Sequence, residues 1–315
     1  MFKVLITETV AKEGIQYLEQ KGYIVKIGRG TDKAALLEDI QDCDAVLVRV
    51  AKIDKEVFDK APNLKVVAKH GVGVDNIDLE AAKKHDCRVV YTPIANLVSV
   101  AEHTIALMCA GAKQILLKTR EYAKGNFGIK DTSFDTEIFG KTVGLIGAGK
   151  IAREVAHIAK HGFRMRVLAF DPFVPADSLG DLLELTDREN VLKESDFVSI
   201  HMPSTKETKK SFSEKEFAMM KKSAWLINTA RGAIVDEEAL IKALRNGEIA
   251  GAALDVTDPE PVARDTSLFT FDNVILTPHC AGCTAESMVR MGTDSAQGID
   301  EVLSGKEPTY AYPGA

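Results

Sequence analysis

Short apolar runs alternate with helix-like stretches over about the first 90 residues of the chain. The runs are rich in β-branched residues and have the length of buried strands; they lie at Lys3–Thr7, Tyr23–Ile27, Ala45–Arg49, Leu64–Lys69 and Arg88–Tyr91. Residues with helical spacing or composition lie between them, at Ala11–Lys21, Ala34–Ile40, Lys55–Lys60 and Leu79–Lys84. This alternation predicts a parallel sheet with helices on both faces.

A second alternating region follows a long helical stretch. The pattern predicts a helix from Val98 to Ala123 and then an irregular segment over Gly125–Phe139. Six more strands are predicted, at Val143–Ile146, Arg166–Phe170, Phe197–Ile200, Ala224–Asn228, Ala250–Leu254 and Val274–Thr277. Six is the number in a complete dinucleotide-binding sheet. One more helix is predicted over Ala285–Leu303.

Composition and charge exclude several classes of protein. The 315 residues are 45% hydrophobic and 27% charged, which fits two packed domains. A net charge of -6 gives no overall attraction to nucleic acid or anionic membranes. No apolar stretch approaches the ~20 residues that span a bilayer, and the start of the chain lacks the features of a signal peptide. We therefore expect a cytoplasmic protein.

The five cysteines do not form a disulfide framework. Cys280 and Cys283 have CxxC spacing, but a zinc site of this kind needs a second pair, which the chain lacks. We therefore expect no metal, and a redox role for the two cysteines stays open.

A glycine-rich turn stands at the start of the second region. Gly147, Gly149 and Ala152 form a G-x-G-x-x-A pattern directly after a strand and before a helix. Such a turn lets a pyrophosphate approach the backbone at the helix N-terminus. Asp171 follows the next strand, 22 residues after Gly149, near the distance at which an acidic residue binds the adenosine ribose. No arginine adjoins it to accept a 2′-phosphate, so the pattern favours NAD over NADP.

Polar side chains follow the later strands of this region. His201, Arg231, Asp255 and His279 come at or shortly after strand ends, and Glu260 lies five residues beyond Asp255. Ligands of open α/β sheets bind at the carboxyl ends of the strands. There Arg231 could hold a carboxylate, His279 could exchange a proton near neutral pH, and Glu260 could stabilise the imidazolium. These roles suit the reduction of a 2-keto acid.

These residues belong to longer stretches with a shared resemblance. The stretches are Gly71–Asp78, Ser99–Thr104, Val143–Ala152, His201–Pro203, Asn228–Gly232, Ala253–Val256 and Thr277–Gly282. In this order they resemble the D-isomer-specific 2-hydroxyacid dehydrogenases, most closely the phosphoglycerate dehydrogenase-like branch. The resemblance implies an α/β protein of two doubly wound parallel-sheet domains. Residues 1–98 plus 287–315 would form a flavodoxin-like substrate domain, and 99–286 a Rossmann NAD-binding domain that also forms a homodimer interface.

The resemblance also implies site residues. The catalytic set would be Arg231, Glu260 and His279. Backbone N–H groups of Gly71, Val72 and Gly73 would bind the substrate carboxylate. The cofactor contacts would be Thr104, Gly147, Gly149, Lys150, Ile151, Asp171, His201, Pro203, Thr208, Thr229, Ala230, Asp255 and Gly282.

The sequence departs from the family in a few places. Ala152 replaces the usual third glycine, Cys280 replaces an apolar residue, and residues 94–98 lack a common Gly-Asn. The chain ends at Ala315, so we expect no regulatory domain. Arg49 and Lys69 lie where the branch keeps basic residues facing the substrate; they could hold a phosphate or second acidic group, or only the common carboxylate.

Three functions remain open at this point. The first is an enzyme acting on a small 2-hydroxy or 2-keto acid, with 3-phosphoglycerate, hydroxypyruvate or glyoxylate, and longer acids as candidates. The second is an NAD(H)-sensing, corepressor-like binding protein on the same fold. A formate dehydrogenase is disfavoured because that group is expected to use an amide in place of Glu260.

Overall fold

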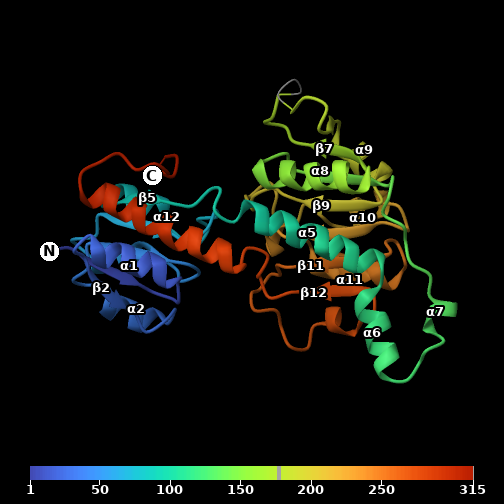
Figure 1. Cartoon of the computed structure of the whole chain (residues 1–315), viewed down its shortest axis with the longest axis horizontal. Coiled ribbons are helices and arrows are strands. Elements are labelled where there is room, and N and C mark those ends of the chain that lie inside the picture. The colour runs from blue at the N-terminus through green and yellow to red at the C-terminus, as the bar shows by residue number, and fades with distance from the viewer. Residues whose placement is uncertain (176–178, 315) are drawn as a thin grey trace. The chain divides into compact units, whose positions relative to one another are not determined.

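Two compact units make up the chain. The computed structural model describes residues 1–175 and 179–314. Unit 1 comprises Met1–Leu97 and Gly282–Ala315, and unit 2 comprises Val98–Ala281. Each unit holds one parallel sheet between helices (Figure 1). The predicted α/β class with two doubly wound sheets is confirmed.

The sheet of unit 1 has five strands in the order β2-β1-β3-β4-β5. Their bounds are β1 Lys3–Ile6, β2 Ile24–Ile27, β3 Ala45–Val48, β4 Val66–Lys69 and β5 Arg88–Val90. All adjacent strands pair in parallel. This is the flavodoxin-like strand order, which the resemblance implies.

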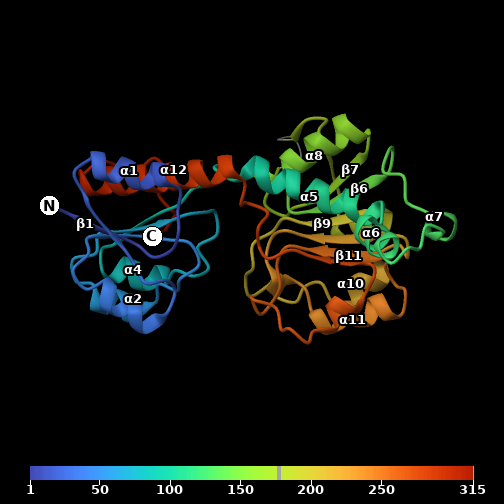
Figure 2. The same ribbon diagram turned by 60° about the horizontal axis from the view of Figure 1, so that its bottom comes forward.

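Helices cover both faces of this sheet. They are α1 Lys12–Gln20, α2 Lys33–Asp39, α3 Lys55–Lys60, α4 Leu79–Lys84 and α12 Ala285–Leu303. Figure 2 shows α1 and α12 on one face, opposite α2 and α4. A Cβ on Gly14 of α1 would lie 2.6 Å from the carbonyl oxygen of Gly292 in α12. This close packing ties the C-terminal helix to the N-terminal unit.

The sheet of unit 2 has seven strands in the order β12-β11-β10-β9-β6-β7-β8. Their bounds are β6 Thr142–Ile146, β7 Arg166–Phe170, β8 Glu184–Leu185, β9 Phe197–Ile200, β10 Trp225–Asn228, β11 Gly251–Leu254 and β12 Val274–Leu276. Read from β8, this is the Rossmann order 3-2-1-4-5-6 with a seventh strand at the edge. The prediction of six strands was wrong, since it lacked β8. This strand is only two residues long and only partly buried, so it leaves no apolar run in the sequence.

The helices of unit 2 pack into two hydrophobic clusters, one on each face of the sheet. α5 (Leu97–Ala112) and α8 (Lys150–Phe163) contribute to one cluster. α9 (Arg188–Glu194), α10 (Glu214–Met219) and α11 (Glu237–Arg245) contribute to the other.

The segment after α5 differs from the prediction. A single helix was expected from Val98 to Ala123, but α5 is followed by a separate α6 at Ile115–Ala123. Gln114 between them has a left-handed φ of 48°, which an α-helix does not accommodate. A short α7 at Ile129–Thr132 interrupts the segment expected to be irregular. Among the described residues no helix is long and apolar enough to cross a membrane.

Candidate active site

The glycine turn joins β6 to α8. Gly147 has a φ of +106°, and a Cβ there would lie 2.6 Å from the carbonyl oxygen of His201, so only glycine fits. Gly149 is the residue before α8, and nothing lies within 4 Å of a Cβ placed on it. Lys150 and Ile151 form the first positions of the helix. The helix N-terminus is therefore open to an approaching anion.

Asp171 lies beside this turn. Its carboxylate accepts hydrogen bonds from the backbone N–H groups of Ala148 (2.8 Å) and Phe173 (2.9 Å). The side chain is half-buried. It is held by one N–H group from the turn between β6 and α8 and by one from the loop after β7. A carboxylate has about four lone-pair sites, so further acceptor capacity remains for hydroxyl groups.

His279 and Glu260 form a hydrogen-bonded pair. His279 Nδ1 lies 2.8 Å from Glu260 Oε2, and Glu260 Oε1 accepts a hydrogen bond from the N–H of Thr257 (3.1 Å). The carboxylate can only accept, so Nδ1 carries the proton and Nε2 is the ring atom left to exchange one. The side chains are 48% and 39% exposed. His279 is thus oriented and accessible at once.

The pKa of Glu260 lies below its ordinary value. Burial raises it, but the hydrogen bond and charge of His279, the N–H of Thr257 and the charge of Arg231 outweigh burial. Glu260 is therefore ionised at neutral pH. A charged partner for the imidazole is present throughout the range in which histidine ordinarily titrates.

Asp255 fixes the backbone that carries His279. Its Oδ1 accepts from the N–H of Cys280 (2.9 Å) and its Oδ2 from the N–H of Ala281 (2.8 Å). Its backbone oxygen accepts from the N–H of His279 (2.7 Å). His279 has a left-handed φ of 51°, which is uncommon for residues other than glycine. The buried carboxylate therefore holds residues 279–281 in this shape.

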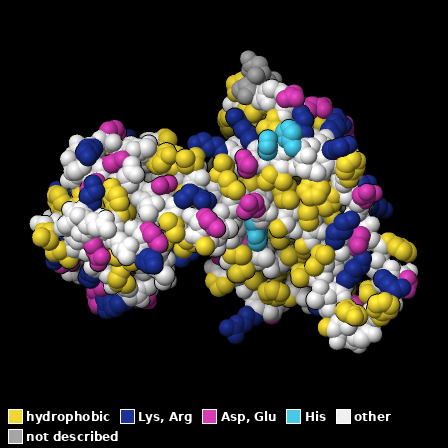
Figure 3. Space-filling model, in the orientation of Figure 1, with side chains coloured by type: hydrophobic (Ala, Val, Ile, Leu, Met, Phe, Trp, Pro, Cys, Tyr) yellow, Lys and Arg dark blue, Asp and Glu magenta, His cyan; other side chains and the backbone are white. Residues whose placement is uncertain are grey.

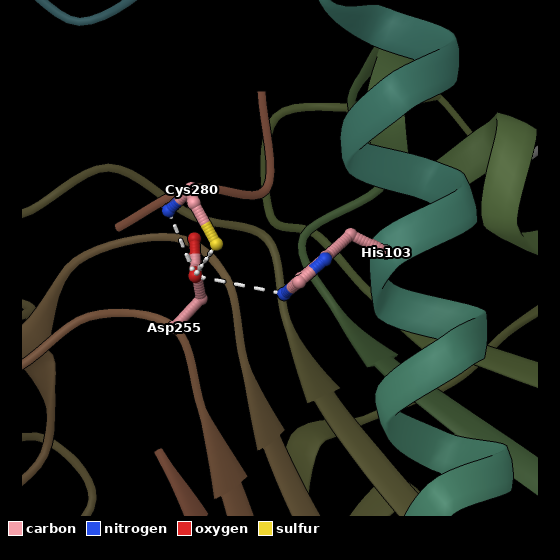
Figure 4. A group of neighbouring side chains, drawn as sticks. All are labelled: His103, Asp255 and Cys280. Atoms are coloured by element: carbon pink, nitrogen blue, oxygen red, sulfur yellow. Dashed lines mark hydrogen bonds and ion pairs between the residues drawn. The ribbon is translucent and has the colours of Figure 1, made fainter. Parts of the chain in front are cut away.

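Two residues that the sequence analysis did not single out complete this network. The hydroxyl of Thr277 donates to Asp255 Oδ1 (2.5 Å). His103 Nε2 lies 3.2 Å from Thr277 Oγ1 and 3.6 Å from Asp255 Oδ1. Figure 4 shows His103 reaching from α5 toward Asp255. His103 lies in the stretch Ser99–Thr104, within which the resemblance implies a role only for Thr104.

Arg231 lies in the loop after β10. Buried Asn228 shapes this loop, since its Oδ1 accepts from the N–H of Ala230 (3.0 Å) and its Nδ2 donates to the carbonyl of Arg231 (3.0 Å). The guanidinium of Arg231 donates to the carbonyl of Ala230 (2.7 Å) and is half-buried. Thr229 in the same loop contacts the hydroxyl of Thr104 at 2.9 Å.

His201 directly follows β9. Its Nε2 lies 2.8 Å from the hydroxyl of Ser199. Burial lowers the pKa of His201 to about 4, so its imidazole is neutral at physiological pH. The hydroxyl of Thr208 donates to the carbonyl of Pro203 (2.7 Å), which closes the loop after this strand.

The substrate residues predicted in unit 1 surround the ends of β3 and β4. Lys69 Nζ donates to the carbonyl of Arg49 and to Asn76 Oδ1 (2.7 Å). Gly71 has a φ of +140°, and its N–H donates to the hydroxyl of Thr92 (2.9 Å). Val72 and Gly73 are partly exposed. Gly282 belongs to this unit, and a Cβ there would lie 3.1 Å from Asn96 Nδ2.

Glu8 holds the loop that carries Arg49. Its carboxylate accepts from the N–H groups of Arg49 (2.9 Å), Val50 (2.5 Å) and Ala51 (3.0 Å). Burial raises the pKa of Glu8. These hydrogen bonds and one from Thr7 lower it by more, so the net pKa lies below its ordinary value. This ionised residue at the end of β1 gave no recognisable signal in the sequence.

Comparisons with known proteins decide the family. Residues 105–281 match the family described as D-isomer specific 2-hydroxyacid dehydrogenase, NAD binding domain. The chain belongs to this family. The matched range contains the glycine turn, Asp171 and the residues Arg231, Glu260 and His279. The resemblance seen in the sequence is confirmed.

Relatives of this dehydrogenase family cover nearly the whole chain. It is 42% identical to D-3-phosphoglycerate dehydrogenase of Methanocaldococcus jannaschii over 97% of this chain and 58% of that protein. The chain therefore spans little more than half the length of that relative. It is 38% identical to glyoxylate reductase of Pyrococcus furiosus over 97% of this chain and 94% of that one.

Solved structures agree with this assignment. The TT0316 protein of Thermus thermophilus matches with a TM-score of 0.92, 35% identity and coverage of 98% and 99% of the two chains. D-lactate dehydrogenase of Lactobacillus jensenii, solved with NAD+, matches with a TM-score of 0.82, 30% identity and 99% coverage of both chains.

Proposed function

We propose that this protein is an NAD-dependent dehydrogenase that interconverts a small D-2-hydroxy acid and its 2-keto acid. The observation that carries the proposal is the His279–Glu260 pair at 2.8 Å. His279 follows the last strand of a dinucleotide-binding sheet, and the buried carboxylate of Asp255 fixes the backbone beside it. A surface histidine without a catalytic task would not need such support.

The residues present fit the dinucleotide. Gly149 leaves open space at the N-terminus of α8, where the pyrophosphate would bind. Asp171 keeps acceptor sites for the ribose hydroxyls, and its charge would repel a 2′-phosphate. Thr104, Lys150, Ile151, His201, Pro203, Thr208, Thr229, Ala230, Asp255 and Gly282 are the further proposed contacts. When bound, the nicotinamide supplies or accepts the hydride at C2 of the substrate.

The protein side chains handle the proton and the carboxylate. His279 Nε2 would donate a proton to the keto oxygen and recover it in the reverse direction. Glu260 would hold the tautomer with Nδ1 protonated and stabilise the imidazolium. Arg231 would bind the substrate carboxylate through its planar guanidinium. Positioned acid–base catalysis of this kind contributes about 10²–10⁴ in rate.

Unit 1 would contribute substrate contacts. We propose that the N–H groups of Gly71, Val72 and Gly73 bind the carboxylate, and that Arg49 and Lys69 add positive charge. Lys69 is ordered by Asn76 and by the carbonyl of Arg49, which fits a fixed ligand contact. Relatives named as phosphoglycerate dehydrogenases and glyoxylate reductases make 3-phosphoglycerate, hydroxypyruvate and glyoxylate the first substrates to test.

We also propose a homodimer formed through unit 2, in the cytoplasm. Large apolar side chains are exposed around α6 and the following segment: Ile115 (50%), Leu116 (46%), Tyr122 (66%), Phe127 (65%) and Phe134 (80%). Figure 3 shows apolar side chains gathered over this region. Exposed patches of this kind often mark an interface.

A substrate panel tests the function. The protein is incubated with NADH and each of a set of 2-keto acids, and the nicotinamide absorbance is followed. We expect turnover with at least one acid, and its loss in His279→Ala with NADH binding retained. NADH binding without turnover of any acid would instead favour an NAD(H)-sensing protein.

A further inference from the structure

Three side chains that can ligate a metal meet at the carboxyl ends of β11 and β12. They are His103 on α5, Asp255 after β11 and Cys280 after β12. Their ligand atoms all lie within 4.8 Å of one another. Figure 4 shows the three side chains pointing toward a common point. They are distant in sequence, so no motif spacing announces them.

The separations suit tetrahedral coordination. Zinc binds Cys sulfur at about 2.3 Å and His nitrogen or carboxylate oxygen at about 2.0–2.2 Å, which places the ligand atoms about 3.3–3.6 Å apart. Asp255 Oδ1 lies 3.6 Å from His103 Nε2 and 3.6 Å from Cys280 Sγ. Small rotations of the two outer side chains would therefore bring all three atoms into range.

Charge and access favour a cation at this point. Asp255 is 1% exposed, and a buried carboxylate is costly unless it is paired. Its Oδ2 accepts from the N–H of Ala281, and its Oδ1 accepts from the N–H of Cys280 and the hydroxyl of Thr277, so a metal at Oδ1 would take the place of the Thr277 hydroxyl. His103 and Cys280 are only partly buried, so an ion could reach the group from solvent. Cysteine, histidine and carboxylate together are the ligands of Zn²⁺ and Co²⁺.

We propose that His103, Asp255 and Cys280 form a binding site for a thiophilic divalent cation such as Zn²⁺. Binding forms a metal–sulfur bond and releases the Cys280 thiol proton to solvent. His103 would ligate through Nε2, which now contacts Thr277 Oγ1, and would keep its ring proton on Nδ1. The metal undergoes no redox change.

The site would also control the cofactor. This consequence rests on the proposed function, which includes Asp255 among the cofactor contacts. A metal held by Asp255 would then compete with the nicotinamide, so that Zn²⁺ inhibits the enzyme.

Cobalt titration of the cofactor-free protein tests the metal site directly. Cobalt bound by a thiolate gives a charge-transfer absorption band in the near ultraviolet. We expect one equivalent to produce this band in the wild-type protein and in the matched control Cys283→Ser. Cys280→Ser should lose the band, and His103→Gln should weaken cobalt binding at least about 10-fold. Thermal unfolding of each variant checks that it folds.

Absence of the band, or its persistence in Cys280→Ser, would overturn the metal site. A second measurement, NADH affinity by fluorescence with and without Zn²⁺, tests the consequence separately. We expect Zn²⁺ to weaken NADH binding at least about 10-fold in the wild-type protein but not in Cys280→Ser. If cobalt binds as expected while NADH affinity is unchanged, the metal site stands and the placement of the nicotinamide beside Asp255 is wrong.

Discussion

The substitution Asp255→Asn distinguishes two roles of this buried residue, which are holding the backbone beside His279 and contacting the cofactor. The structure shows its carboxylate holding the backbone of Cys280 and Ala281, next to His279. Asparagine has nearly the same shape but offers one acceptor oxygen and one NH₂ group. One of the two backbone N–H groups would therefore face another donor. Residues 279–281 would lose the conformation that orients the imidazole.

The size of the effect follows from the hydrogen bonds. A bond to a charged group is worth about 1.5–3 kcal/mol and a neutral one about 0.5–1.5 kcal/mol. Losing one charged bond and weakening the other costs about 3 kcal/mol. Since about 1.4 kcal/mol is tenfold in rate, we expect kcat to fall about 100-fold. Thr277→Val removes only the hydroxyl donor to the same carboxylate and should cost less than about 10-fold.

Steady-state kinetics with NADH and the best 2-keto acid measure both variants. Amide hydrogen exchange reports the mobility of residues 279–281 and should rise in Asp255→Asn. The reasoning is refuted if kcat stays within about threefold of wild type while the KM for NADH rises. That result would make Asp255 a cofactor contact and nothing more.

Three further predictions concern charge. Glu260→Gln should lower kcat about 10-fold, because a charged hydrogen bond between half-exposed groups becomes neutral; an unchanged kcat in the steady-state assay would contradict this. Asp171→Asn should reduce the preference for NADH over NADPH by about 10-fold, measured as the ratio of kcat/KM values, and an undiminished preference would argue against its role. Burial lowers the pKa of His70 to about 4, whereas the unfolded chain binds this proton below about 6.5. The contribution of His70 to stability should therefore be full above pH 6.5 and fall toward pH 4, by about 2 kcal/mol between pH 7 and 5; urea unfolding of His70→Gln should show a loss that is smaller than the wild-type loss by about this amount, and an equal loss would refute the assignment.

The sequence predicted most elements because their apolar periodicity agrees with their burial. β9, β10 and β11 are buried at every position, and short, mostly apolar runs with β-branched or aromatic residues are typical of interior strands. β8 escaped prediction because it is short and partly exposed. The break between α5 and α6 escaped because Gln114 adopts a left-handed conformation without a glycine or proline to signal it.

The site divides along the same lines. Residues with a motif or a strand-end position, such as Gly147, Asp171 and His279, could be named from the sequence. His103 contacts a residue that lies 174 positions away in the sequence, and Glu8 contacts residues that lie 41 to 43 positions away. Such contacts depend on tertiary packing, which periodicity and spacing do not encode. His103, Asp255 and Cys280 also come together only through tertiary packing, because no local motif spacing links them.

The central claim is that this chain uses NADH to reduce a 2-keto acid to the D-2-hydroxy acid. The most direct measurement is NADH-dependent reduction of pyruvate, glyoxylate, hydroxypyruvate and 3-phosphohydroxypyruvate, with chiral analysis of every product that has a stereocentre. We expect stoichiometric NADH oxidation with at least one of these four acids, and the D configuration in every product that has a stereocentre. An L product, or no oxidation of NADH with any of these acids, would contradict it.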